Sequence, residues 1–170
     1  VRFCHYSGVK VYVTLNTLVF DREIPLLAKA IENCAKADVD AFIVQDMGVA
    51  RLARQIVPEL PLHASTQMTV NSPEGAIMAK ELGFTRVVLG RELSLAQIKA
   101  ITESCEIETE LFVHGALCVC ISGQCYMSSV LGGRSGNRGL CAQPCRLDFT
   151  SGDRHNVLSL KDLSLTEKLP

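Results

Sequence analysis

The chain has 170 residues, 48% of them hydrophobic, and its formal net charge is -1. It is therefore long and apolar enough to bury a core as one globular unit, and too close to neutral for a dedicated nucleic-acid-binding tail. No hydrophobic run reaches the roughly 18 residues of a membrane span, and the first residues lack the pattern of a secretory signal, so we expect a cytoplasmic location and no membrane partner.

Short hydrophobic runs rich in β-branched residues alternate along the chain with stretches whose hydrophobic residues recur every three to four positions. The runs predict buried strands, and the stretches predict amphipathic helices. Strands are expected at 9–19, 41–44, 60–64, 86–89, 110–113 and 157–160, and helices at 24–37, 49–57, 72–82 and 94–103. This alternation predicts a parallel sheet whose strands are joined by helices.

The number of strands points to an incomplete barrel. Five or six strands are visible, whereas a closed barrel of this class has eight. We expect an α/β fold, a partial, truncated TIM-type β/α barrel with parallel strands, followed by a Cys/Gly/Arg-rich segment. The expected divisions are the barrel at 1–131, a Cys/Arg-rich loop segment at 132–156, and a further barrel strand with the start of a helix at 157–170. Unpaired strand edges could then support oligomerisation.

Polar residues follow the expected strands at the point where each strand ends. In parallel α/β proteins the loops at the carboxyl ends of the strands form the ligand-binding face. Loops are polar in any case, and a lone histidine is more often structural than catalytic, so each residue has a structural alternative. The candidate catalytic residues are Asp46, Glu92 and His114, and the candidate substrate-binding residues here are Asn16, Gln67, Arg91 and Lys161.

Five of the eight cysteines lie between Cys118 and Cys145, while Cys4, Cys34 and Cys105 are scattered and are expected to be small core residues. Such crowding favours metal ligation over a disulfide framework. Four thiolates suit either an iron–sulfur cluster or a zinc ion, and their spacing leaves both open. The candidate ligands are Cys118, Cys125, Cys141 and Cys145, and Cys120 is expected to point away from them.

Three arginines accompany the cysteines. Guanidinium groups bind phosphate and carboxylate through paired hydrogen bonds, so this region predicts recognition of an anionic substrate. A solvated surface loop is the structural alternative. The candidates are Arg134, Asn137, Arg138 and Arg146.

Residues 110–128 resemble, at every fixed position, the pattern E-x-F-x-x-G-[SA]-[LIVM]-C-x4-G-x-C-x-[LIVM]-S of the collagenase-like peptidase family. Residues 133–146 are similar to the family as well, as are the shorter pieces 14–17, 63–67, 91–93 and 161–163, so the resemblance covers nearly the whole chain. It implies a 4Fe-4S cluster in preference to zinc. Because members differ in the place of the fourth ligand, Cys145 is the ligand that the resemblance fixes least.

The resemblance also implies several functions. Some members support hydroxylation of bases in tRNA or rRNA, and others serve oxygen-independent ubiquinone synthesis; residues 133–146 are most similar to the RNA-hydroxylating branch. We therefore expect an iron–sulfur enzyme that takes RNA and a small anionic cosubstrate. The alternatives are a peptidase, with Cys120 and His114 as a conceivable dyad, and a non-catalytic, cluster-stabilised scaffold for RNA or protein. Neither H-E-x-x-H nor G-x-S-x-G occurs, which disfavours the usual protease routes.

Overall fold

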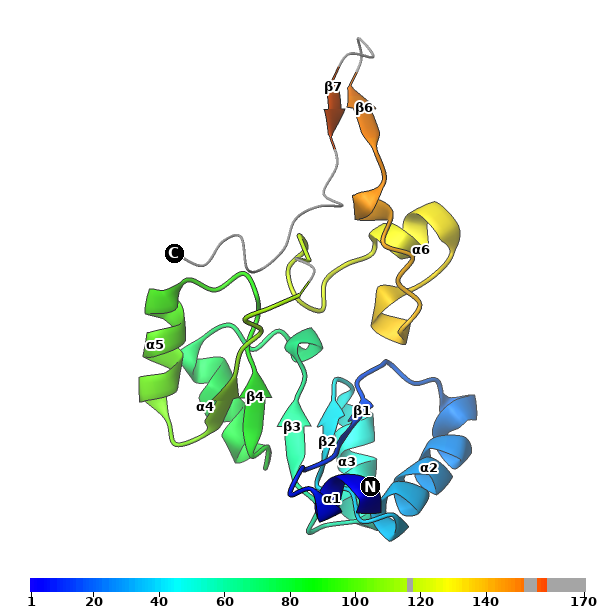
Figure 1. Cartoon of the computed structure of the whole chain (residues 1–170), viewed down its shortest axis with the longest axis vertical. Helices are drawn as coiled ribbons and strands as arrows, with labels where there is room; N and C mark the ends of the chain where they lie inside the picture. The colour runs from blue at the N-terminus through cyan, green and yellow to red at the C-terminus, as the bar shows by residue number, and fades with distance from the viewer. Residues whose placement is uncertain (116–117, 152–155, 159–170) are drawn as a thin grey trace.

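The computed structural model describes residues 1–115, 118–151 and 156–158. Its main body is one parallel sheet whose strands follow sequence order, with a helix between each strand and the next (Figure 1). The strands are β1 (Tyr12–Leu15), β2 (Ala41–Val44), β3 (Leu62–Ala64), β4 (Arg86–Val88) and β5 (Glu108–Glu110). The helices are α1 (Arg2–Tyr6), α2 (Ile24–Lys36), α3 (Met47–Ile56), α4 (Pro73–Glu81) and α5 (Leu95–Ser104). The predicted strand–helix alternation and parallel sheet are confirmed.

One face of the sheet carries the hydrophobic core. Phe42 and Val44 of β2 are fully buried and pack in one cluster with Ile31 of α2, Ala53 of α3 and Ile101 of α5. Because side chains alternate along a strand, the opposite face receives a different set. On that face, one residue from each of the five strands lies beside its partner on the next strand. These residues are Thr14, Ile43, His63, Arg86 and Glu108.

Sequential strand order, with α2 to α5 packed in one core against the sheet, is an arrangement also found within β/α barrels. Over the described residues, however, the sheet is open, since β1 and β5 are its edge strands. The α/β class with a parallel sheet therefore holds, whereas closure into a barrel does not follow from this structure. Within the same residues, no helix combines the length and the hydrophobicity that crossing a membrane requires.

Three expected strands differ clearly from the structure. The run expected at 9–19 is a strand only over Tyr12–Leu15, as β1. β5 occupies Glu108–Glu110 instead of 110–113, because the register sets Glu108 beside Arg86, which forms ion pairs with Glu108 and Glu110. The strand expected at 157–160 was predicted to continue the barrel, and this is wrong for its described part. β7 (Asn156–Leu158) pairs antiparallel with β6 (Phe149–Ser151) in a separate hairpin that projects away from the sheet (Figure 1).

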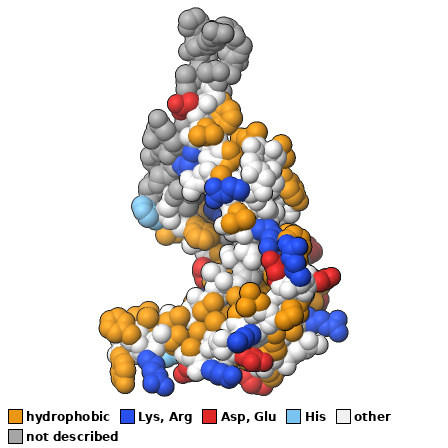
Figure 2. Space-filling view, turned by 90° about the vertical axis from the view of Figure 1, so that its right-hand side faces the viewer, with side chains coloured by type: hydrophobic (Ala, Val, Ile, Leu, Met, Phe, Trp, Pro, Cys, Tyr) orange, Lys and Arg blue, Asp and Glu red, His pale blue; other side chains and the backbone are white. Residues whose placement is uncertain are grey.

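Residues 118–146, which we call the cysteine segment, lie beyond the carboxyl ends of the strands (Figure 1). The segment contains α6 (Met127–Gly132) and the short 3-10 helices η3 (Gly136–Arg138) and η4 (Pro144–Arg146). It is thus not a plain loop, and the division expected after residue 131 falls inside α6. Figure 2 shows hydrophobic side chains exposed on this part of the molecule as well as on the body that holds the sheet.

Candidate functional site

The cysteine segment is attached to the sheet at two places, and the first is Ser122. The Glu92 carboxylate, in the loop between β4 and α5, accepts hydrogen bonds from the Ser122 backbone N–H at 3.0 Å and from its hydroxyl at 2.9 Å. The Asn71 side-chain amide donates to the same carboxylate at 3.0 Å. Burial works against ionisation of Glu92, yet these hydrogen bonds and one from its own backbone outweigh burial and hold the pKa of Glu92 below its ordinary value.

The second attachment is Arg138, which reaches back to the loop between β1 and α2. Its guanidinium donates to both carboxylate oxygens of Glu23, at 2.7 and 2.8 Å, and to the Leu18 carbonyl at 2.6 Å. It also lies over the Phe20 ring, 4.3 Å from the centroid. Its charge and donors are thus used inside the protein, which gives Arg138 an anchoring role, while the predicted substrate binding by Arg138 stays a prediction.

The cysteine segment carries five thiols that act on one another electrostatically. Cys120 is influenced by Cys125 and Cys118, and Cys145 is influenced by Cys118 and Cys141. Burial raises the pKa of the Cys120 thiol, and the nearby Cys125 and Cys118 raise it further. Burial likewise raises the pKa of Cys145, with Cys118 adding to the effect and Arg146 opposing it.

The thiols are gathered without forming a finished metal site. Among residues 1–115, 118–151 and 156–158, no group of three or more Cys, His, Asp or Glu side chains is arranged to hold a metal ion. All five cysteines of the segment are free, and Cys118 and Cys141 are exposed. Cys120 was expected to point away from the ligands, and this stays a prediction, although the Cys125 thiol is near enough to influence the pKa of Cys120. Soft thiols at this density nevertheless suit a cluster or a zinc ion by donor chemistry.

The candidate catalytic residues other than Glu92 lie in contrasting surroundings. Asp46 caps α3, accepting from the Gly48 N–H at 2.7 Å and the Val49 N–H at 3.3 Å, and it also accepts from the Val19 N–H at 3.3 Å. This explains Asp46 structurally, and a catalytic role stays a prediction. His114 is exposed and lies four residues past the end of β5, not at a strand end as the sequence suggested.

The candidate substrate-binding residues divide between the sheet rim and the cysteine segment. Asn16 and Gln67 are half-buried after β1 and β3, while Arg134 is exposed and donates to the Leu140 carbonyl at 3.1 Å. Asn137 is buried, and its backbone carbonyl accepts from Leu18. Arg146 is half-buried in η4 beside Cys145, and Lys161 lies outside the described residues.

Sequence reasoning missed one rim residue, Gln45. It follows β2 directly, is 9% exposed, and its side-chain oxygen has no hydrogen-bond partner within the described residues. The buried Nε of Arg91, which follows β4, likewise has no hydrogen-bond partner within the described residues. Buried polar groups are normally satisfied, so two such atoms after β2 and β4, at the same edge of the parallel sheet, mark the rim as a place for a polar ligand. Strand-end position alone could have drawn attention to Gln45.

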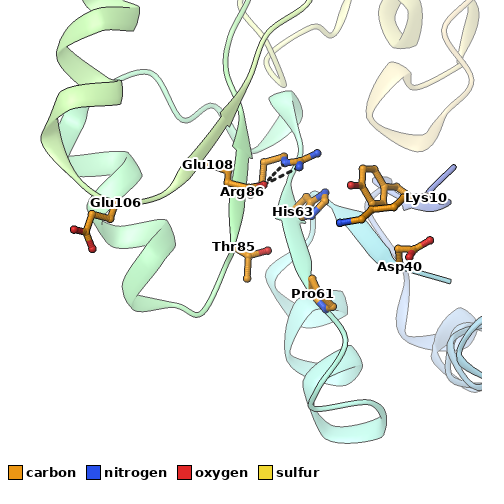
Figure 3. A pocket seen from close by; sticks show the side chains of 9 residues that line it. Lys10, Asp40, Pro61, His63, Thr85, Arg86, Glu106 and Glu108 are labelled. Atoms are coloured by element: carbon orange, nitrogen blue, oxygen red, sulfur yellow. Dashed lines mark hydrogen bonds and ion pairs between the residues drawn. The ribbon is translucent and has the colours of Figure 1, made fainter. Parts of the chain in front are cut away.

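A pocket of about 330 Å³ lies at the opposite ends of the strands (Figure 3). It contains Lys10, His63 and the Arg86–Glu108 ion pair, with the Tyr12 ring edge-on to His63 at 4.8 Å. Burial lowers the pKa of His63, and the Arg86 charge lowers it further. Parallel α/β proteins place their chemistry at the carboxyl ends of the strands, whereas this pocket lies at the amino ends. We therefore do not include the pocket in the candidate site.

Relatives with assigned names are similar over most of the chain. Over 177 aligned positions it is 44% identical to a 23S rRNA 5-hydroxycytidine synthase of Escherichia coli, covering 99% of this chain and 27% of the relative. It is 39% identical to tRNA hydroxylation protein P of Helicobacter pylori, covering 88% and 36%. It is 35% identical to a collagenase of Porphyromonas gingivalis, covering 92% and 40%. The chain thus spans well under half the length of these relatives.

A solved structure of a U32 peptidase shares the fold. The TM-score is 0.57 at 19% identity, and the match covers 68% of this chain and 50% of that one. The family model described as Peptidase family U32 matches residues 1–170. With its sheet, its cysteine segment and this full-length match, the chain belongs to peptidase family U32.

Proposed function

We propose that this chain is the cluster-bearing core of an enzyme that supports hydroxylation of a base in rRNA or tRNA. The proposal rests on the composition of the cysteine segment. Apart from Pro144, its buried residues Ser122, Ser128 and Asn137 are polar, while hydrophobic residues such as Val130 are exposed, at 81%. A segment of this kind cannot be held together by a hydrophobic core and needs another source of stability. Five gathered thiols offer that source in a metal centre.

Cys118, Cys125, Cys141 and Cys145 would hold a 4Fe-4S cluster, with zinc as the alternative. A bound cluster would supply electron transfer beside the rim of the sheet. Arg134 and Arg146 would place positive charge near the net-negative thiolates, and ligation would convert loosely gathered thiols into a fixed centre. Further strands beside the edge strands β1 and β5 would continue the sheet towards a barrel.

The rim would take the base and its cosubstrate. Replacing C–H by C–OH adds one oxygen atom to the base and withdraws two electrons, so the reaction needs an oxygen source, such as water or the cosubstrate, and an acceptor for two electrons. Gln45 offers a carboxamide for the edge of a base, and Arg91 offers guanidinium donors for an anionic cosubstrate. The names of the Escherichia coli and Helicobacter pylori relatives support RNA as the substrate class.

A peptidase is the second candidate, favoured by the relative named collagenase. A cysteine nucleophile needs a lowered thiol pKa and a histidine partner. Burial and the nearby thiols of Cys125 and Cys118 instead raise the pKa of Cys120. These features disfavour Cys120 as a nucleophile, so we place RNA modification first.

The test is nucleoside mass spectrometry of rRNA and tRNA from a strain that lacks this gene and its paralogues. Complementation with the full-length wild type should restore a hydroxylated base, and Cys34→Ser, outside the segment, should do the same. Cys118→Ser and Cys125→Ser should fail, with loss of iron and sulfide from the anaerobically purified protein. Unchanged RNA in every strain would refute the proposal, and RNA binding without chemistry in cluster-loaded protein would favour the scaffold.

A further inference from the structure

The loop 121–124 is the most firmly attached part of the cysteine segment. Ser122, at its centre, is 1% exposed, and all three of its polar groups are engaged. Its N–H and hydroxyl donate to Glu92, while its carbonyl accepts from the Thr69 hydroxyl at 2.8 Å. The Gln124 side chain donates to that same hydroxyl at 3.2 Å. A loop with every polar group of its central residue satisfied by the rim is held in one position.

Glycines bring the loop and the rim into contact. Gly123 has φ of +77° and lies directly against the Gln67 carbonyl, where a Cβ atom would collide with backbone. On the rim side, a Cβ at Gly90 would lie 2.9 Å from the Glu92 carboxylate carbon and would also collide with Asn71. The absence of side chains at both positions therefore lets the Glu92 carboxylate and the loop backbone meet.

The loop connects directly to the thiols. Ser122 lies two residues after Cys120, three before Cys125 and four after Cys118. The short chain lengths between them mean that the Ser122 contact restricts where these three of the five thiols stand relative to the sheet. Glu92 supplies two of the hydrogen bonds that fix it.

We propose that Glu92 is a positioning residue that locks the loop 121–124 to the sheet rim and so presets the thiols of Cys118, Cys120 and Cys125. This replaces the acid–base role expected from its strand-end position, because both carboxylate oxygens accept hydrogen bonds within the protein. The locking itself follows from the contacts above. Only its consequence for an iron–sulfur centre depends on the proposed function.

The first experiment needs no cluster. In full-length, metal-free, reduced protein, the rate of alkylation by iodoacetamide is followed at each cysteine by peptide mass spectrometry. Glu92→Ala should raise the rates at Cys120 and Cys125 several-fold. Glu92→Gln, which keeps one carbonyl acceptor, should raise them less. Cys34 and Cys105, packed against the hydrophobic core, should not change and serve as internal references.

Glu108→Ala is the matched control. It removes a carboxylate that pairs with Arg86 at 2.7 Å on β5, in the pocket at the other ends of the strands. It should leave alkylation of Cys120 and Cys125 at the wild-type rate. Unchanged rates in Glu92→Ala, or an equal rise in Glu108→Ala, would overturn the proposal.

The second experiment separates positioning from catalysis. After anaerobic reconstitution with iron and sulfide, Glu92→Ala should bind less iron than wild type and show an altered electron paramagnetic resonance line shape. Wild-type alkylation and wild-type cluster spectra in Glu92→Gln, combined with lost RNA hydroxylation, would make Glu92 catalytic and overturn the positioning role. If the wild type itself takes up no iron while the alkylation rates shift as expected, the lock stands and the iron–sulfur function fails.

Discussion

The sheet with its helices and the cysteine segment are stabilised in opposite ways. In the part of the chain that the structure describes, every buried hydrophobic residue lies at or before Ile107. The cysteine segment instead buries polar residues and exposes Tyr126, Val130 and Leu131. One region is held by hydrophobic burial, the other by a few hydrogen bonds to the first. The sheet can therefore fold on its own side chains, whereas the segment depends on the sheet and, as we propose, on a metal centre.

The largest expected effect comes from removing a side chain of the hydrophobic core. Phe42→Ala, on the central part of β2, should lower the free energy of unfolding by about 3–5 kcal/mol through lost burial and a residual cavity. Urea unfolding monitored by circular dichroism measures this. Phe3→Ala, at an 85% exposed position, should change it by no more than about 0.5 kcal/mol. An equal loss of unfolding free energy in both variants would mean that hydrophobic burial is not the main source of stability in the body that holds the sheet.

A smaller effect is expected at the cap of α3. Asp46→Ala should cost about 1 kcal/mol, because the Gly48 and Val49 N–H groups lose their acceptor. Asp46→Asn keeps a capping oxygen and should retain most of that stability. If Asp46 were also catalytic, Asp46→Asn would lose RNA hydroxylation at nearly wild-type stability. Thermal unfolding together with nucleoside analysis therefore distinguishes the two roles.

The cysteine segment should open locally when its second attachment, the contact between Arg138 and Glu23, is removed. Arg138→Gln removes the ion pair with Glu23 and should raise hydrogen exchange over residues 133–146, with little change in the melting temperature of the whole protein. Arg134→Gln is the control, because Arg134 is exposed and contacts only its own segment through the Leu140 carbonyl in the described contacts. Global destabilisation by Arg138→Gln would show that the segment and the sheet unfold together.

The smallest expected effect is a pH dependence of this same attachment. Hydrogen bonding to Arg138 is the main cause that lowers the pKa of Glu23 to about 2 from 4.5. Because the attached state has the lower pKa, the detached state binds more protons between these values, and attachment weakens as pH falls from 4.5 towards 2. Pepsin cleavage of residues 133–146 should increase through this window in wild type. In Glu23→Gln, cleavage should already be high and should follow only the intrinsic pH profile of the protease.

Much of the sheet could be predicted because hydrophobic periodicity reports burial directly. The runs at 41–44 and 86–89 became β2 and β4, since both lie between neighbours and read as hydrophobic on both faces. The run 110–113 misled, because Leu111, Phe112 and Val113 are hydrophobic yet 41% to 62% exposed. Register with Arg86, a contact distant in sequence, placed β5 two residues earlier.

By itself, the sequence determined the parallel α/β pattern, the family and the crowding of cysteines, because each depends on residue type and local spacing. Tertiary structure decided which charges are used within the protein. Arg138 meets Glu23 across 115 positions, and Glu92 meets Ser122 across 30. No local pattern predicts such pairs, because they exist only once the cysteine segment folds back over the rim. That folding back makes Glu92 and Arg138 the two attachment points of the segment.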